Sequence, residues 1–279
     1  MKSLAKKIKA DVSKQRQEGR EQQEWYFKQL YNATKHWCPP ERVNTERRVF
    51  LPKLFGTSGG VKLSKAALAV YPILCSLADF EKDGWVQVSQ ENISAMAGIS
   101  VPTVRKAMRE LRGVTHTAKK REGEKLEGTI AKQFGFPLVR YRTHIKEKRQ
   151  FYLYKVGFFR KAMLRGWKGN YHPFYTCIIE SGIWAKLTPL TKALYLAMLC
   201  NAEQHYELYC KVEGVQRLTV EKYYERRKWD VCWTPLTELA RQVGYSKNPK
   251  IHVEQLVRYG LVERVGKWFK IYLKPKSIR

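Results

Sequence analysis

The apolar residues that follow Ser89 recur at helical spacing. Ser89 is a good N-cap, because its hydroxyl can accept a hydrogen bond from a free backbone N–H of the first turn. Ile93, Met96 and Ala97 then fall on one face of two helical turns. Gly98 can adopt the left-handed backbone conformation that a sharp stop requires. The pattern therefore predicts a short helix that ends in a tight turn.

A second helix is expected immediately after this turn, over residues 101–112. Ser100 can cap it, and Val104, Met108 and Leu111 repeat at spacings of four and three residues, which defines an inward face. The outward face carries Thr103, Arg105, Lys106 and Arg109. This is a helix-turn-helix arrangement, in which the second helix enters the major groove of DNA.

The same order of elements is expected a second time. Residues 234–246 predict a helix that ends at Gly244, and a second helix begins near residues 248–249, where Pro249 fits the first helical position. Val253 and Leu256 face inward in this helix. The outward residues, which are less basic than those of the first copy, are Lys247, Asn248, Lys250, His252 and Glu254.

Each copy continues into alternating residues that predict a β-hairpin, or wing. In the first copy residues 138–142 pair with 150–154 around a basic tip at 143–149, and in the second the hairpin spans 261–273 around Gly266. A helix opening at Ser64 or Thr188 and a short strand at 85–89 or 230–234 precede each pair of helices. The first copy has an insertion at 113–136, and the second has about 20 extra residues between Cys200 and Thr234.

These patterns predict a mainly α fold with small β-hairpins, hence an α+β fold, built from two winged-helix domains in tandem. The predicted divisions are a basic N-terminal helical arm (1–60), winged-helix domain 1 (61–157), a linker (158–186) and winged-helix domain 2 (187–279). Within the second insertion, residues 222–228 interleave tyrosines with cations, which suits contact with a nucleic-acid backbone or stacking on bases.

The charge balance points to a polyanionic partner. The 279 residues carry a formal net charge of +28, which favours nucleic acid over an anionic membrane surface. The longest mainly apolar run, residues 66–78, contains Pro72 and is too short to cross a bilayer. The N-terminus lacks an apolar signal core, and six scattered cysteines do not form a secreted disulfide framework. We therefore expect a soluble, cytoplasmic protein with no membrane partner.

Motifs for catalysis or metal binding are incomplete. Residues 56–63 resemble a phosphate-binding loop, but Val61 and Leu63 replace its second glycine and its hydroxyl residue. Cys200, His205 and Cys210 are spaced five residues apart, which scatters them around a helix and does not suit zinc. We therefore expect no enzyme activity, no cofactor and no metal.

The stretch SQENISAMAGISVPTVRKAMREL resembles the helix-turn-helix of winged-helix DNA-binding proteins. Together with the duplication and the basicity, it makes the chain similar to the tandem winged-helix replication initiators of plasmids and phages. The resemblance implies a protein that binds origin repeats in double-stranded DNA, promotes origin opening, can form a homodimer and recruits a host helicase or other replication proteins. One departure is that the first copy carries the more basic recognition helix. The sequence therefore leaves open which domain reads bases and which domain dimerises.

The residues expected to contact DNA come from the recognition helices and the wings. They are Ser100, Thr103, Arg105, Lys106, Arg109, Arg140, Arg142, Lys146, Lys148, Arg149, Lys247, Asn248, Lys250, His252, Arg264 and Lys267. Three alternatives stay open. A transcriptional repressor could use the same modules, a basic RNA-binding protein would have a similar composition, and the second winged helix could pack against another subunit.

Overall fold

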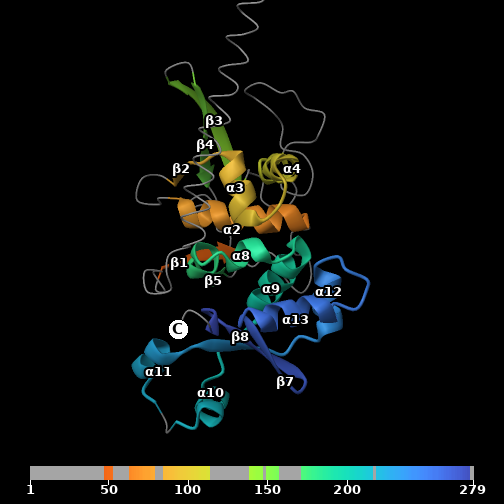
Figure 1. Cartoon of the computed structure of the whole chain (residues 1–279). Helices are drawn as coiled ribbons and strands as arrows, with labels where there is room; N and C mark the ends of the chain where they lie inside the picture. The colour runs from red at the N-terminus through yellow and green to blue at the C-terminus, as the bar shows by residue number, and fades with distance from the viewer. Residues whose placement is uncertain are drawn as a thin grey trace, which may run out of the picture.

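The computed structural model describes residues 47–52, 63–78, 84–113, 138–146, 149–156, 171–215 and 218–276. Over these residues the chain is an α+β protein in which helices pack between and against small antiparallel sheets (Figure 1). The strand orders in these sheets are β1-β5, β2-β4-β3 and β6-β8-β7. None of the helices described here is long and apolar enough to cross a membrane.

The first unit, which runs from α2 to β4, has the predicted order of elements. They are α2 (Lys65–Leu77), β2 (Trp85–Gln87), α3 (Gln90–Ala97), α4 (Val101–Leu111), β3 (Val139–Lys146) and β4 (Arg149–Val156). The predicted caps are also present, since the Ser89 hydroxyl accepts a hydrogen bond from the Asn92 N–H and Gly98 has a φ of 60°. Val104, Met108 and Leu111 are buried, which confirms the inward face of α4.

The second unit, from α9 to β8, repeats this order. Its elements are α9 (Pro189–Asn201), β6 (Trp229–Cys232), α12 (Leu236–Gln242), α13 (Lys250–Arg258), β7 (Val262–Val265) and β8 (Trp268–Tyr272). Gly244 and Gly266 have φ angles of 63° and 59° at the predicted turns. Pro249 lies one position earlier than predicted. It is the N-cap residue of α13 and not the first helical residue. The Asn248 side chain accepts a hydrogen bond from the Lys250 N–H, 3.0 Å away.

The extra residues of the second unit form α10 (Tyr206–Glu213) and α11 (Val220–Arg226). Their buried tyrosines, Tyr209 and Tyr223, pack in one cluster with Trp229 of β6 and Tyr272 of β8. The insertion therefore covers the face of the β6-β8-β7 sheet that the helix pair leaves open. The first unit's insertion falls almost entirely outside the described residues.

The first wing is longer than its sequence suggests. Its strands continue in register from Val139↔Val156 to Lys146↔Arg149. Most of the segment predicted as the tip (143–149) therefore forms paired strands. The turn itself falls at residues 147–148, which lie outside the described part of the chain.

Parts of the predicted arm and linker contribute to the core instead of lying apart from it. They form β1 (Arg48–Pro52), β5 (Tyr171–Tyr175), α7 (Cys177–Glu180) and α8 (Ile183–Lys186). β1 and β5 pair antiparallel, with Arg48 opposite Tyr175. Leu51, Phe174 and Trp184 are fully buried, so their apolar area stabilises the shared interior. Residues 1–46 of the predicted arm lie outside the described residues.

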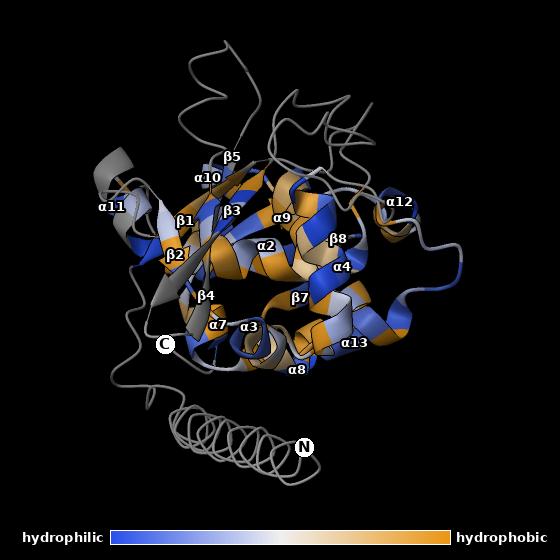
Figure 2. Ribbon diagram, turned by 90° about the horizontal axis from the view of Figure 1, so that it is seen from above, coloured by the Kyte–Doolittle hydropathy of each residue, from blue (hydrophilic) through white to orange (hydrophobic). Residues whose placement is uncertain are grey.

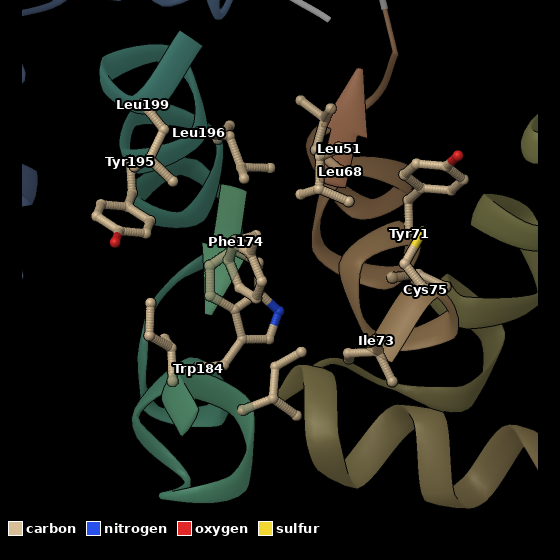
Figure 3. Packing of buried hydrophobic residues seen from close by; sticks show 14 of the residues in the cluster. Leu51, Leu68, Tyr71, Ile73, Cys75, Phe174, Trp184, Tyr195, Leu196 and Leu199 are labelled. Carbon is tan, nitrogen blue, oxygen red and sulfur yellow. The ribbon is translucent and has the colours of Figure 1, made fainter. Parts of the chain in front are cut away.

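One apolar cluster runs through both units. Leu68 and Ile73 of α2 belong to the same cluster as Trp184 of α8 and Leu196 of α9 (Figure 3). The indole N–H of Trp184 donates to the Ala69 carbonyl oxygen of α2 at 2.9 Å, which satisfies its only polar atom. The two units therefore share their interior across α2, α8 and α9.

We predict that Lys192 makes the stability of the fold depend on pH. Lys192 of α9 is fully buried, and its ammonium donates to the Leu187 carbonyl. Burial lowers its pKa from 10.5 to about 7, so the unfolded chain binds more protons than the folded chain between these values. The loss of folding free energy caused by burying the charged ammonium is fully present below about pH 7. It disappears as the pH rises towards 10.5. Lys192→Met should therefore stabilise the protein at pH 7, by on the order of 1–4 kcal/mol.

Urea unfolding of the native chain and of Lys192→Met across this pH range measures the effect. The variant's excess free energy of unfolding should shrink steadily as the pH rises. Taking the difference between the two proteins removes the contribution of groups that titrate in both. Lys186→Met, at an exposed lysine of α8, is the matched control. A constant difference between Lys192→Met and the native chain would contradict the burial effect.

Candidate nucleic-acid interface

The outward face of α4 is cationic. Arg105 and Lys106 are exposed, and the Arg105 Nε donates to the Gln90 Oε1 of α3 at 2.9 Å, which ties the two helices of the pair together. Arg109 is half-buried one turn further on. Thr103 lies at the N-terminal end, where its hydroxyl is 2.8 Å from that of the capping Ser100. These four outward residues and Ser100 all lie on or directly before α4, as the sequence predicts.

The only acidic residue of α4 is used elsewhere. Glu110 accepts hydrogen bonds from the backbone N–H and the hydroxyl of Ser64, at 2.7 and 2.5 Å. Its carboxylate therefore sits at the N-terminus of α2, where the helix dipole favours negative charge. This contact keeps a counter-charge away from the Arg105 and Lys106 side of the helix.

The outer face of the β2-β4-β3 sheet carries further cations of the first unit. Arg140 of β3 lies directly opposite Lys155 of β4, and Lys155 lies opposite Trp85 of β2. The Arg142 guanidinium sits 4.4 Å from the centre of the Trp85 ring, and the Lys155 ammonium sits 5.5 Å from it. Like charges directly opposite each other destabilise a sheet, so this face suits an anionic partner.

The sequence reasoning missed Trp85 and Lys155, and also the stacking of Arg112 on Tyr141 at 3.6 Å. The signal that could have found Lys155 is the strand register, because residues opposite Arg140 share its face. Of the other predicted wing residues, Lys146 and Arg149 lie in the strands, but their side chains are not among those described. Lys148 lies outside the described residues.

The second unit presents a different surface. Lys247, Asn248 and Lys250 are exposed around the start of α13, as predicted, and Lys250 lies 3.9 Å from Glu254. The exposed side chains of α13 also include the apolar Ile251, at 67%. At the second wing, the Arg264 Nε donates to the Gly266 carbonyl at 3.3 Å, and Lys267 is exposed at the turn. This surface is less basic than that of α4.

His252 does not face outward as predicted. Its Nδ1 lies 2.9 Å from the Thr191 Oγ1 of α9, and burial together with the charge of Lys65 lowers its pKa. Gln255, one turn later, accepts a hydrogen bond from the same Thr191 hydroxyl at 2.6 Å. The helical period placed His252 on the outside, whereas packing against α9 turns it inward.

The short helix α8 contacts both helix pairs. An added Cβ at Gly98 would lie 1.9 Å from the Ala185 carbonyl oxygen, so the turn between α3 and α4 presses directly on α8. The next carbonyl, of Lys186, accepts a hydrogen bond from the Gln255 Nε2 of α13 at 3.1 Å. Figure 2 shows α4 and α13 on the same side of the molecule, away from β1, β2 and α11. The two candidate recognition helices are therefore held together through α8.

Within the described residues, no group of three or more His, Cys, Asp or Glu side chains could hold a metal ion. The described cysteines are free thiols, and all of them except Cys210 are buried. Burial raises the pKa of the Cys75 and Cys177 thiols to about 12, which keeps them protonated.

Comparison with known proteins gives one weak likeness. No family model and no curated protein matches the chain. Among solved structures, the chain is similar to one described as the crystal structure of Pi initiator protein in complex with iteron DNA. The identity is 10% and the TM-score is 0.39, over 82% of this chain and 98% of the other. A likeness this weak supports no conclusion about function.

We predict that the two turn glycines respond differently to the same substitution. Gly98 and Gly244 have φ angles of 60° and 63°, but a Cβ at Gly244 would meet nothing within 4 Å. Gly244→Ala should therefore cost only the left-handed strain of about 1–2 kcal/mol. Gly98→Ala should cost clearly more, because the Ala185 carbonyl must move as well. Urea unfolding of both variants gives the difference, and equal losses would contradict the close contact with α8.

Proposed function

We propose that this chain is a sequence-specific double-stranded DNA-binding protein with two winged-helix domains. The observation that carries the proposal is the face of α4. Its apolar side is buried, its exposed side presents Arg105 and Lys106, and it follows directly on the tight turn at Gly98. A helix held in this way can enter the major groove with its cationic side towards the base edges.

The contacts divide into base readout and phosphate anchoring. Arg105 and Lys106 can reach acceptors on guanine, and Ser100 and Thr103 lie near the helix N-terminus, where backbone and hydroxyl groups suit a phosphate. Arg140, Arg142 and Lys155 on the outer face of the first wing anchor the flanking backbone. In the second unit, Lys247 and Lys250 anchor α13, and the exposed Ile251 suits contact with a thymine methyl group.

The role that we propose within this class is replication initiation. Its support is the resemblance of the duplicated helix-turn-helix units and their basicity to tandem winged-helix initiators, together with the contacts that join the two units through α8. A protein with two recognition helices held in one orientation suits repeated sites of fixed geometry. Binding to such repeats at an origin, formation of a homodimer and recruitment of host replication proteins follow from that resemblance.

Selection of bound fragments from the protein's own replicon tests this role, followed by footprinting at about 150 mM salt, where non-specific electrostatic binding is weakened. Protection of several evenly spaced repeats beside an A·T-rich stretch would support an initiator. A single protected palindrome over a promoter would replace it with a repressor, and a preference for RNA over duplex DNA would overturn both. Protection without sequence preference would remove the proposed base readout.

We predict that two arginines of the first unit have separable effects on DNA binding. Arg105→Ala should cost about 1–3 kcal/mol on the selected site and much less on random DNA, because it removes a base contact. Arg140→Ala should weaken binding to both DNAs alike and reduce the slope of log K against log salt by about 1. Fluorescence anisotropy at several salt concentrations measures both quantities.

Lys211→Ala is the matched control, because this exposed lysine lies on α10, away from both recognition helices (Figure 1). Lys211→Ala removes the same charge, but at a distance from the interface. It should therefore leave the affinities for the selected site and for random DNA nearly unchanged. Equal losses for Arg105→Ala on specific and random DNA would assign Arg105 to the phosphates instead. If neither arginine substitution changes the affinity for DNA, the DNA interface does not lie on the first unit.

A further inference from the structure

A pocket of about 370 Å³ lies on the opposite side of the molecule from α4 and α13. Arg48, Tyr175, Tyr224, Arg227 and Leu273 line it. These residues come from β1, from β5, from α11 and the residue after it, and from the residue that follows β8. β1, β5 and α11 lie at the left of Figure 1. Its volume falls within the range of small-molecule binding sites. DNA bound along the recognition helices would not fill it.

Arg227 is the more buried of the two arginines that line this pocket. Its side chain is only 8% exposed, and its Nε lies 3.3 Å from the Asp230 Oδ1. Its Nη1 is buried and has no hydrogen-bond partner among the described residues. An enclosed guanidinium N–H without an acceptor is costly, so the ion pair with Asp230 leaves part of the Arg227 guanidinium uncompensated beside the pocket. A guanidinium suits the oxygens of a phosphate, which it can bind in a bidentate manner.

A second cation stands at the rim. Arg48 is exposed on β1, directly opposite Tyr175 in the β1-β5 register, and its guanidinium lies 5.6 Å from the Phe50 ring. Lys274 adds positive charge, since its ammonium lies 5.4 Å from the centre of the Tyr175 ring. Asp230, whose Oδ1 lies 3.3 Å from the Arg227 Nε, is already paired with Arg227. The pocket is therefore electropositive and suits an anion with more than one oxygen.

The remaining wall is aromatic and apolar. Tyr175 and Leu273 are buried, whereas Tyr224 is 57% exposed and presents its ring at the rim, 5.8 Å from the Arg227 guanidinium. A tyrosine face beside a guanidinium is a surface on which a nucleobase stacks. Inorganic phosphate would use only the arginines, whereas a ligand with both a phosphate and a planar ring would use the whole lining.

We propose that this pocket binds a mononucleotide, with its phosphate between Arg227 and Arg48 and its base against the ring of Tyr224. The ligand is a separate small molecule, so the site is additional to the proposed DNA interface and does not depend on it. The same chemistry could also come from one nucleotide of a single strand, and the experiment below separates these two sources.

Isothermal titration calorimetry of the full chain with AMP, ATP, adenosine and inorganic phosphate tests the site. We expect saturable binding of a nucleotide, and much weaker binding of adenosine and of phosphate alone. Arg48→Ala should weaken nucleotide binding by about tenfold or more, because it removes a charge-assisted hydrogen bond. Tyr224→Ala should weaken binding of the nucleotide but leave binding of phosphate unchanged. Both residues are exposed at the rim, so both variants should fold.

Three further measurements separate the possible results. Lys211→Ala should bind nucleotide like the native chain, and so should an Arg105→Ala/Arg140→Ala variant, even where it no longer binds duplex DNA. Absence of saturable binding by every nucleotide at millimolar concentration would overturn the proposal. A short single strand that binds at this site far more tightly than any mononucleotide, with the same sensitivity to Arg48→Ala, would overturn it in favour of a strand as the ligand.

Discussion

The three carbonyl and side-chain contacts of α8 determine how the two helix pairs sit relative to each other. Trp184 donates to α2, the Ala185 carbonyl faces Gly98 after α3, and the Lys186 carbonyl accepts from Gln255 of α13. Successive helical residues point about 100° apart, so three adjacent residues can contact three different elements. The last carbonyls of a helix have no partners inside it, which leaves those of Ala185 and Lys186 available to neighbouring elements.

This constraint explains why the core is continuous. Because α8 packs against α2 and precedes α9 directly, the apolar interiors of the two units merge into one cluster. Two recognition elements joined by a flexible linker would lose orientational freedom on binding, whereas elements held through a packed core have already lost it during folding. Under the proposed function, the shared core therefore favours DNA targets whose two half-sites have a fixed geometry. A mutation that displaces the backbone of α8 should therefore act on both units at once.

Features set by local physics could be predicted from the sequence, and features set by distant contacts could not. The caps at Ser89 and Ser100, the turn at Gly98 and the buried stripe of α4 depend on residues within a few positions of one another. The four-residue helices α7 and α8 are too short to show a period, so the sequence predicts only a linker for their segment. The sequence predicts an outward His252, because nothing nearby in the chain indicates its contact with Thr191, 61 residues away. Arg227 could be predicted as basic, but its enclosure by Tyr224 and β1 could not.

The charge on the outer face of the first wing links stability to binding. Arg140 and Lys155 face each other across two strands, and Arg142 and Lys155 share the ring of Trp85. This arrangement costs free energy in the isolated chain, because like charges repel and the aromatic ring offsets only part of the repulsion. An anion that lies along this face removes the repulsion, so it binds the folded chain better than the unfolded one and stabilises it. The second unit has no such like-charge pair among its described strand residues, since Lys270 lies opposite Glu263. Under the proposed function, the described strands of the first unit should therefore contribute more to the electrostatic part of DNA binding than those of the second.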